Sequence, residues 1–64
     1  MNNFDAEQEI IQHSFELLGK VLHEENCKQI VTQQIEDIYG INKDISTEIV
    51  EMAFEQWAEV YYLE

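Results

Sequence analysis

The sequence contains neither proline nor arginine, and it has only two glycines and one cysteine among its 64 residues. One cysteine cannot form a disulfide within the chain, and together with two histidines it supplies too few ligands for a closed structural zinc site. His23 and Cys27 are four positions apart, but we expect a helix break at Asn26 to separate them. We therefore expect no metal, no other cofactor, and a reducing compartment, the cytoplasm.

Long apolar runs are also missing. A membrane-spanning helix requires about 18 consecutive apolar residues, and residues 1–5 have neither the basic start nor the apolar stretch of a signal peptide. The scarcity of proline and glycine also leaves no linker, low-complexity tract or internal repeat. We expect residues 1–64 to form a single domain that does not associate with a membrane.

A chain this short has little apolar material from which to build a core. A domain of about 60 residues buries only about 60% of the surface that its unfolded chain exposes. Such a core rarely contributes more than about 3–5 kcal/mol without a disulfide, a metal or oligomerisation. Formation of a homodimer would compensate for this, and it stays open as an expectation.

Positive charge is scarce as well. Fourteen Asp and Glu residues stand against three Lys residues, which gives a formal net charge of −11. Such a field repels nucleic acids and anionic membranes, and it attracts basic surfaces at a rate that depends on ionic strength. The hydrophobic fraction of 45% argues against disorder. The expected partner is therefore a basic protein surface, with no direct binding of nucleic acid.

Apolar residues recur at helical spacing in three blocks. This pattern predicts an all-α fold, a small three-helix bundle with helices at about 5–25, 27–39 and 46–62. Gly19 lies inside the first helix and is expected to weaken that helix by about 1 kcal/mol relative to alanine. The bundle is expected to stand alone or to be completed by a second copy of the chain.

Short polar residues and one glycine predict where the helices begin and end. Asp5 and Asn26 are the expected N-caps of the first two helices. Gly40 is expected to end the second helix in the left-handed conformation. After a turn, either Asp44 or Ser46 is expected to cap the third helix.

The third helix carries an unusually wide apolar arc. Two adjacent stripes form this arc: Val50, Phe54, Trp57 and Tyr61, and beside them Ile45, Ile49, Met52, Val60 and Leu63. At 100° per residue the two stripes cover about 200°, which is more than a helix needs to face its neighbours in a small bundle. Either this helix is the central element of the bundle, or part of the arc contacts a partner.

Four glutamates line one ridge opposite this arc: Glu48, Glu51, Glu55 and Glu59. Like charges at this spacing destabilise a helix by some tenths of a kcal/mol per pair, so a role in binding is more plausible than a role in folding. A strand of duplex DNA carries one phosphate per ~3.4 Å of axis, and the ridge carries one carboxylate per ~5 Å. The ridge could therefore occupy a groove lined with Lys and Arg. The alternative is an ordinary solvated face that keeps the protein soluble.

Aromatic residues and one amide complete the candidate contacts. Trp57 and Tyr61 are of the types that dominate protein interfaces, although a Trp in a small bundle is more often simply its largest core residue. Tyr62 falls on the acidic side by angle, which favours a contact role. Gln56 falls within the second apolar stripe. It could bond to a neighbouring helix, lie at the wet edge of the core, or set the register of an interface as a lone polar residue.

Catalytic patterns are missing from the sequence. There is no glycine-rich phosphate loop and no Ser/His/Asp arrangement on a plausible scaffold. So small a bundle is also expected to have little room for a pocket of the usual volume, about 300 Å³ or more. We expect no enzymatic activity.

The leading functional hypothesis is an acidic inhibitor or regulator that imitates nucleic acid and occupies a basic surface of a nucleic-acid-processing enzyme or effector. Small size and acidity favour a bacterial setting, with a phage-encoded anti-restriction or anti-CRISPR protein as one form. The alternative is a helical interaction or dimerisation module (antitoxin, antirepressor or adaptor) that binds through the apolar face of the third helix. The expected partner-binding residues are Glu48, Glu51, Glu55, Glu59, Tyr62, Gln56, Trp57 and Tyr61.

Overall fold

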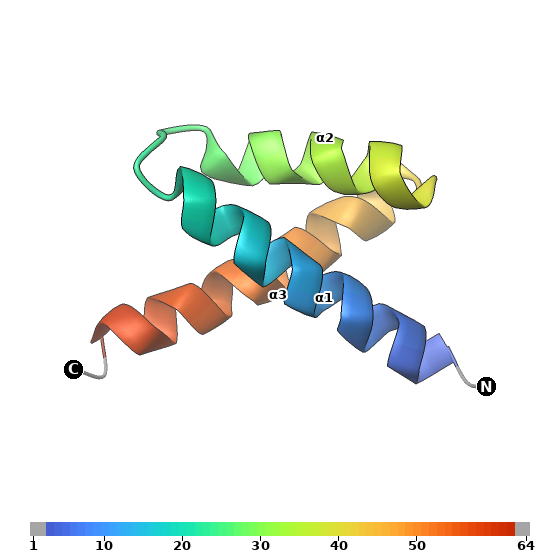
Figure 1. Ribbon diagram of the computed structural model, residues 1–64, viewed down its shortest axis with the longest axis horizontal. Coiled ribbons are helices and arrows are strands. Elements are labelled where there is room, and N and C mark those ends of the chain that lie inside the picture. The colour runs from blue at the N-terminus through green and yellow to red at the C-terminus, as the bar shows by residue number, and fades with distance from the viewer. Residues whose placement is uncertain (1–2, 63–64) are drawn as a thin grey trace.

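The computed structural model describes the backbone of residues 3–62 and the side chains of residues 5–60. This part of the chain forms three helices, α1 (Asn3–Val21), α2 (Cys27–Tyr39) and α3 (Lys43–Tyr62). Figure 1 shows α1 crossing α3 near the middle of both helices, with α2 along one side of the crossing. The predicted all-α three-helix bundle is confirmed. Among the described residues, no helix combines the length and the apolar character that a membrane crossing needs.

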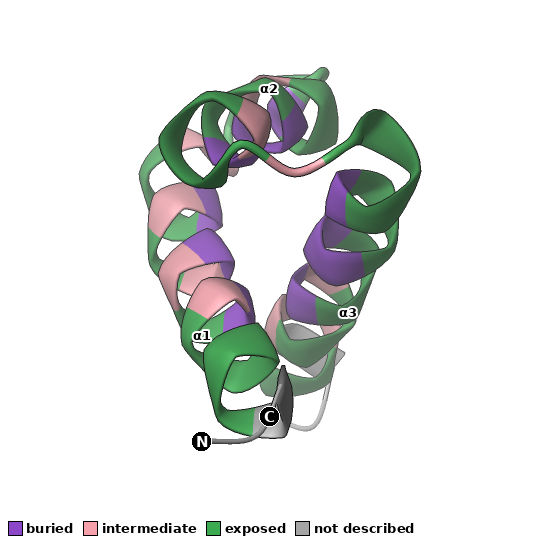
Figure 2. Ribbon diagram, turned by 90° about the vertical axis from the view of Figure 1, so that its right-hand side faces the viewer, coloured by how far each residue is buried: buried purple, intermediate pink, exposed green. Residues whose placement is uncertain are grey.

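All three helices contribute to one core. Figure 2 shows their buried segments turned toward one another. The buried apolar residues are Ile11, Leu18, Cys27, Val31, Ile35, Ile49, Val50 and Ala53. Removing this apolar surface from water is the main contribution to stability. Small polar residues also lie in the core: Ser14 and Ser46 are fully buried, and their hydroxyls donate to the carbonyls of Ile10 and Asn42, both at 2.8 Å.

A close approach of α3 to α1 explains why Gly19 lies within a helix. The indole of Trp57 stacks on the ring of Phe15, with centroids 4.3 Å apart and planes 7° apart. Its N–H donates to the carbonyl of Phe15 at 2.7 Å. A Cβ atom on Gly19 would lie 2.8 Å from Cζ2 of Trp57, closer than carbon atoms normally approach. Gly19 therefore leaves space for the indole, and α1 continues through it without a break.

The ends of α1 differ from the prediction. Asp5 lies in the first turn of the helix, so its assignment as N-cap was wrong. The helix ends at Val21, earlier than the predicted residue 25, because tighter turn bonds replace the helical pattern there. The N–H of Glu24 donates to the carbonyl of Val21 at 2.9 Å, and the N–H of Cys27 donates to that of Glu24 at 3.3 Å. Asn26, where a helix break was predicted, is the last residue of this connection.

The boundaries of α2 agree better with the sequence pattern. Asn26 occupies the N-cap position as expected, but its side chain makes no capping hydrogen bond. Its φ of −102° and ψ of 31° lie outside the extended region from which such a side chain reaches the first free N–H groups. Gly40 has φ 65° and ψ 29°, and its N–H donates to the carbonyl of Glu36 at 2.8 Å. The predicted left-handed stop at Gly40 is confirmed.

The start of α3 was predicted three residues too late. The helix begins at Lys43, and Oδ1 of Asn42 accepts the N–H of Ile45 at 2.9 Å, which is the capping bond. Asp44 and Ser46 lie in the first turn, so neither is the cap. Asn42 has this role because it follows the helix stop closely and its short amide reaches the free N–H groups of the new helix.

Candidate functional site

The outer side of α3 carries a continuous row of carboxylates. The early start of the helix adds Asp44 to the four predicted glutamates, and all five side chains are exposed. We call this row the acidic ridge: Asp44, Glu48, Glu51, Glu55 and Glu59. Its members lie within about 80° of the helix circumference and span about 22 Å of its axis. The buried residues of α3 lie on the opposite side, so the ridge faces solvent.

One member of the acidic ridge, Glu51, forms an ion pair with another helix. Oε1 of Glu51 lies 2.9 Å from Nζ of Lys28 on α2, and both side chains are about half exposed. The same ammonium lies 4.8 Å from the centroid of the Phe54 ring. Among the side chains of residues 5–60, no cation lies within ion-pairing distance of Glu48, Glu55 or Glu59. These three carboxylates are thus available to a partner, and Glu51 is partly neutralised.

An apolar stripe runs beside the acidic ridge. We define it as Ile45, Met52 and Val60, whose exposed fractions are 47%, 39% and 47%. Ile49 belongs to the same face by angle, but it is buried in the core. Gln56 is exposed between Met52 and Val60, which agrees with the wet-edge interpretation of this residue. The wide apolar arc of α3 is therefore divided into a part that holds the bundle together and a part that faces solvent.

The predicted aromatic contacts fall into two groups. Trp57 is only partly exposed and is engaged with Phe15 and Gly19 of α1, which favours the interpretation of Trp57 as a core residue. The backbones of Tyr61 and Tyr62 complete α3, but their side chains lie outside the described residues. The predicted site residues that come together at the surface are thus the four glutamates and Gln56.

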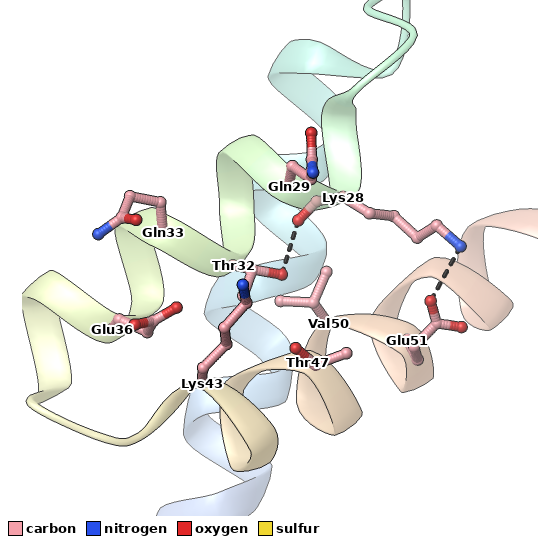
Figure 3. A pocket seen from close by; sticks show the side chains of 9 residues that line it. All are labelled: Lys28, Gln29, Thr32, Gln33, Glu36, Lys43, Thr47, Val50 and Glu51. Carbon is pink, nitrogen blue, oxygen red and sulfur yellow. Dashed lines mark hydrogen bonds and ion pairs between the residues drawn. The ribbon is translucent and has the colours of Figure 1, made fainter.

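A polar groove of about 410 Å³ lies between α2 and α3. Figure 3 shows Lys28 reaching across it to Glu51, with Lys43 rising from α3 toward Thr32. The lining residues are Lys28, Gln29, Thr32, Gln33, Glu36, Lys43, Thr47, Val50 and Glu51. Two lysines and two glutamates make this lining formally neutral, and it includes no histidine, cysteine or serine. The groove therefore offers no net charge that would select a basic partner.

A second open groove, also of about 410 Å³, lies where the connection between α1 and α2 meets α3. The expectation that so small a bundle leaves little room for a pocket was therefore wrong, because the helices diverge from their crossing. Cys27 lines this groove but is itself buried, whereas His23 is exposed and lies 3.2 Å from Glu24. Within the described residues, no three His, Cys, Asp or Glu side chains gather in a way that could hold a metal ion.

Comparisons of the chain with protein-family models, with curated proteins and with solved structures found no match. The functional argument therefore rests on the outer side of α3, where the acidic ridge and the apolar stripe lie next to each other.

Proposed function

We propose that this chain is a non-enzymatic binding protein that inhibits or regulates a nucleic-acid-processing protein by covering its basic surface with the acidic ridge. The observation that carries the proposal is the ridge itself, five exposed carboxylates in one row that faces away from the bundle. A cytoplasmic inhibitor of bacterial defence, such as a phage-encoded anti-restriction or anti-CRISPR protein, is one setting that fits.

The dimensions of the ridge support imitation of a nucleic-acid strand. Five carboxylates over about 22 Å of helix axis compare with about six phosphates along the same length of one DNA strand. A groove lined with Lys and Arg would therefore meet a similar number of carboxylates, of which Glu51 is already paired with Lys28. The net charge of −11 adds a long-range attraction that accelerates the encounter at low ionic strength.

The ridge also does little for the fold, which supports a role in binding. Its members lie three or four residues apart, where like charges repel and destabilise a helix. Within residues 5–60, the one ion pair that joins the ridge to another helix is that of Glu51 with Lys28. Within the same residues, Glu48, Glu55 and Glu59 have no ion pair that would explain their alignment. Cations of another molecule would offset the repulsion among them.

The test uses this chain to capture proteins from a bacterial lysate at low salt and then elutes the captured proteins with duplex DNA. The wild-type chain should retain nucleic-acid-binding proteins, and DNA should displace them because both compete for the same basic surfaces. A variant with Glu48, Glu55 and Glu59 changed to Gln should lose these proteins. Retention of the same proteins by this variant would show that the ridge is not the binding element.

A matched control separates the position of the charges from their number. Changing Glu7, Glu9 and Glu16 to Gln removes the same three negative charges from α1, where all three side chains are exposed. This control variant should retain most of the captured proteins. Equal losses in the two variants would mean that only the net charge matters, which is the solvated-face interpretation.

The exposed apolar stripe favours a second candidate function, a helical interaction or dimerisation module such as an antitoxin, antirepressor or adaptor. Three large apolar side chains of α3, Ile45, Met52 and Val60, are exposed, and the core of this small chain does not need them. This function predicts binding that survives about 0.5 M salt and the ridge variant. Because Trp57 holds α1 and α3 together, changes at Met52 and Val60 test this function more cleanly than Trp57→Ala does.

A further inference from the structure

We infer that the apolar stripe and the acidic ridge form one docking surface, and that its occupant is a cationic amphipathic helix of the partner protein. This inference rests on the proposed function and names the element that the ridge recognises. Apolar side chains of the partner helix would cover Ile45, Met52 and Val60, while its Lys and Arg side chains would reach the ridge.

The two features are close enough to act together. Met52 lies four residues after Glu48 and three before Glu55, and Ile45 lies three before Glu48. Residues three or four apart on a helix have Cβ atoms about 5–6 Å from each other. Ile45 and Met52 therefore each have a carboxylate beside them, and a partner that covers these side chains meets the ridge as well.

The shape of the surface favours a helix. The apolar stripe runs along the helix axis, and from Ile45 to Val60 it spans about 22 Å, or four helical turns. Another helix matches such a stripe with apolar residues at every third or fourth position. Met52 lies near the middle, and its unbranched side chain can adapt to the side chains placed on it. A nucleic-acid strand, in contrast, has no apolar row that would use this stripe.

The charge of the surface selects a cationic partner over a second copy of the chain. Two copies docked through this face would bring two acidic ridges together, each from a molecule with a net charge of −11. The ridge also lies on only one side of the apolar stripe, since the core-facing residues Val50 and Ala53 lie on the other. The basic residues of the partner helix must therefore lie along one flank of its apolar row.

The experiment measures binding of a synthetic peptide by fluorescence anisotropy. The probe is a helical peptide of about 18 residues, with leucines at every third or fourth position and lysines along one flank. A control peptide has the same composition with the lysines on the face opposite the leucines. The wild-type chain should bind the first peptide about tenfold more tightly than the second, because only the first can place its leucines on the apolar stripe and its lysines beside the acidic ridge at the same time.

Two variants of the protein separate the contributions. Changing Met52 and Val60 to Ser should weaken binding about tenfold at both low and high salt, because both side chains are exposed and would act as apolar anchors. Changing Glu48, Glu55 and Glu59 to Gln should weaken binding mainly at low salt. Circular dichroism should show the helical signal of the wild type in both variants.

The outcomes distinguish this inference from the proposed function. If the Met52 and Val60 variant binds as tightly as the wild type, or if neither peptide binds, the docking surface proposed here is wrong, while capture of nucleic-acid-binding proteins could still support the proposed function. If the ridge variant binds the peptide equally well and also retains the captured proteins, the proposed function fails. A wild-type dimer that dissociates on the changes at Met52 and Val60 would assign the stripe to a second copy.

Discussion

The contact between Gly19 and Trp57 predicts a change in stability on replacing Gly19 that is opposite in sign to the usual effect at a helical glycine. Replacing a glycine inside a helix with alanine ordinarily stabilises the helix by about 1 kcal/mol. Here the added Cβ would lie 2.8 Å from Cζ2 and 3.4 Å from Cη2 of Trp57. These atoms belong to a rigid ring held by stacking on Phe15 and by a hydrogen bond to its carbonyl. Gly19→Ala should therefore destabilise the protein.

The size of the effect follows from the packing, hydrogen bond and stacking that the indole would lose. Overpacking of this kind costs about 1–3 kcal/mol. Loss of the hydrogen bond from the indole costs about 0.5–1.5 kcal/mol if the ring moves out, and loss of the stacking on Phe15 costs a similar amount. After subtraction of about 1 kcal/mol for the gain in helix propensity, we expect a net destabilisation of up to about 2 kcal/mol. This is a large part of the stability that a domain of this size possesses.

Urea denaturation followed by circular dichroism measures the change, and a second background tests its cause. In a Trp57→Phe protein the smaller ring lacks the atoms that the new Cβ would meet. Gly19→Ala should then stabilise the protein by about 1 kcal/mol, as in an ordinary helix. Stabilisation by Gly19→Ala in both backgrounds would refute the close approach of Trp57 to α1.

Two further predictions concern α3, and thermal or urea denaturation checks both. Asn42→Ala should cost about 1 kcal/mol because it removes the capping bond to the N–H of Ile45, whereas Asp44→Ala, in the first turn, should cost less than half as much. Glu51→Gln should cost at most about 1 kcal/mol and lose its effect at high salt, since Glu51 pairs with a half-exposed lysine. Glu55→Gln should leave stability unchanged or raise it by a few tenths of a kcal/mol, because it removes only repulsion. Equal costs within either pair would contradict the assigned contacts.

The centres of the helices could be predicted from the sequence, but their ends could not. Apolar periodicity extends over many residues and tolerates local ambiguity, so it located all three helices. The end of α1 depends on turn hydrogen bonds around Glu24, and no residue type in the sequence predicts these bonds. The start of α3 was marked by Asn42, a good capping residue, but Asp44 and Ser46 offered equally good side chains a few positions later.

Contacts between residues far apart in the chain could not be predicted from the sequence pattern. Gly19 appeared only as a weak point of a helix, because its partner Trp57 lies 38 positions further along the chain. The alignment of the glutamates on α3 was predictable, since it depends on helical spacing alone. The pairing of Glu51 with Lys28 was not, because it depends on how α2 packs against α3.

The division of the apolar arc of α3 is the step that changes the functional argument. Sequence spacing presented acidic binding and apolar binding as competing hypotheses on opposite sides of the helix. Packing of the three helices buries Ile49 and leaves Ile45 and Met52 exposed next to the acidic ridge. Both kinds of contact are then available to one partner element, and its specificity would come from matching them together. A surface that used carboxylates alone would attract any cation, whereas an adjacent apolar row admits only those basic surfaces that also present one.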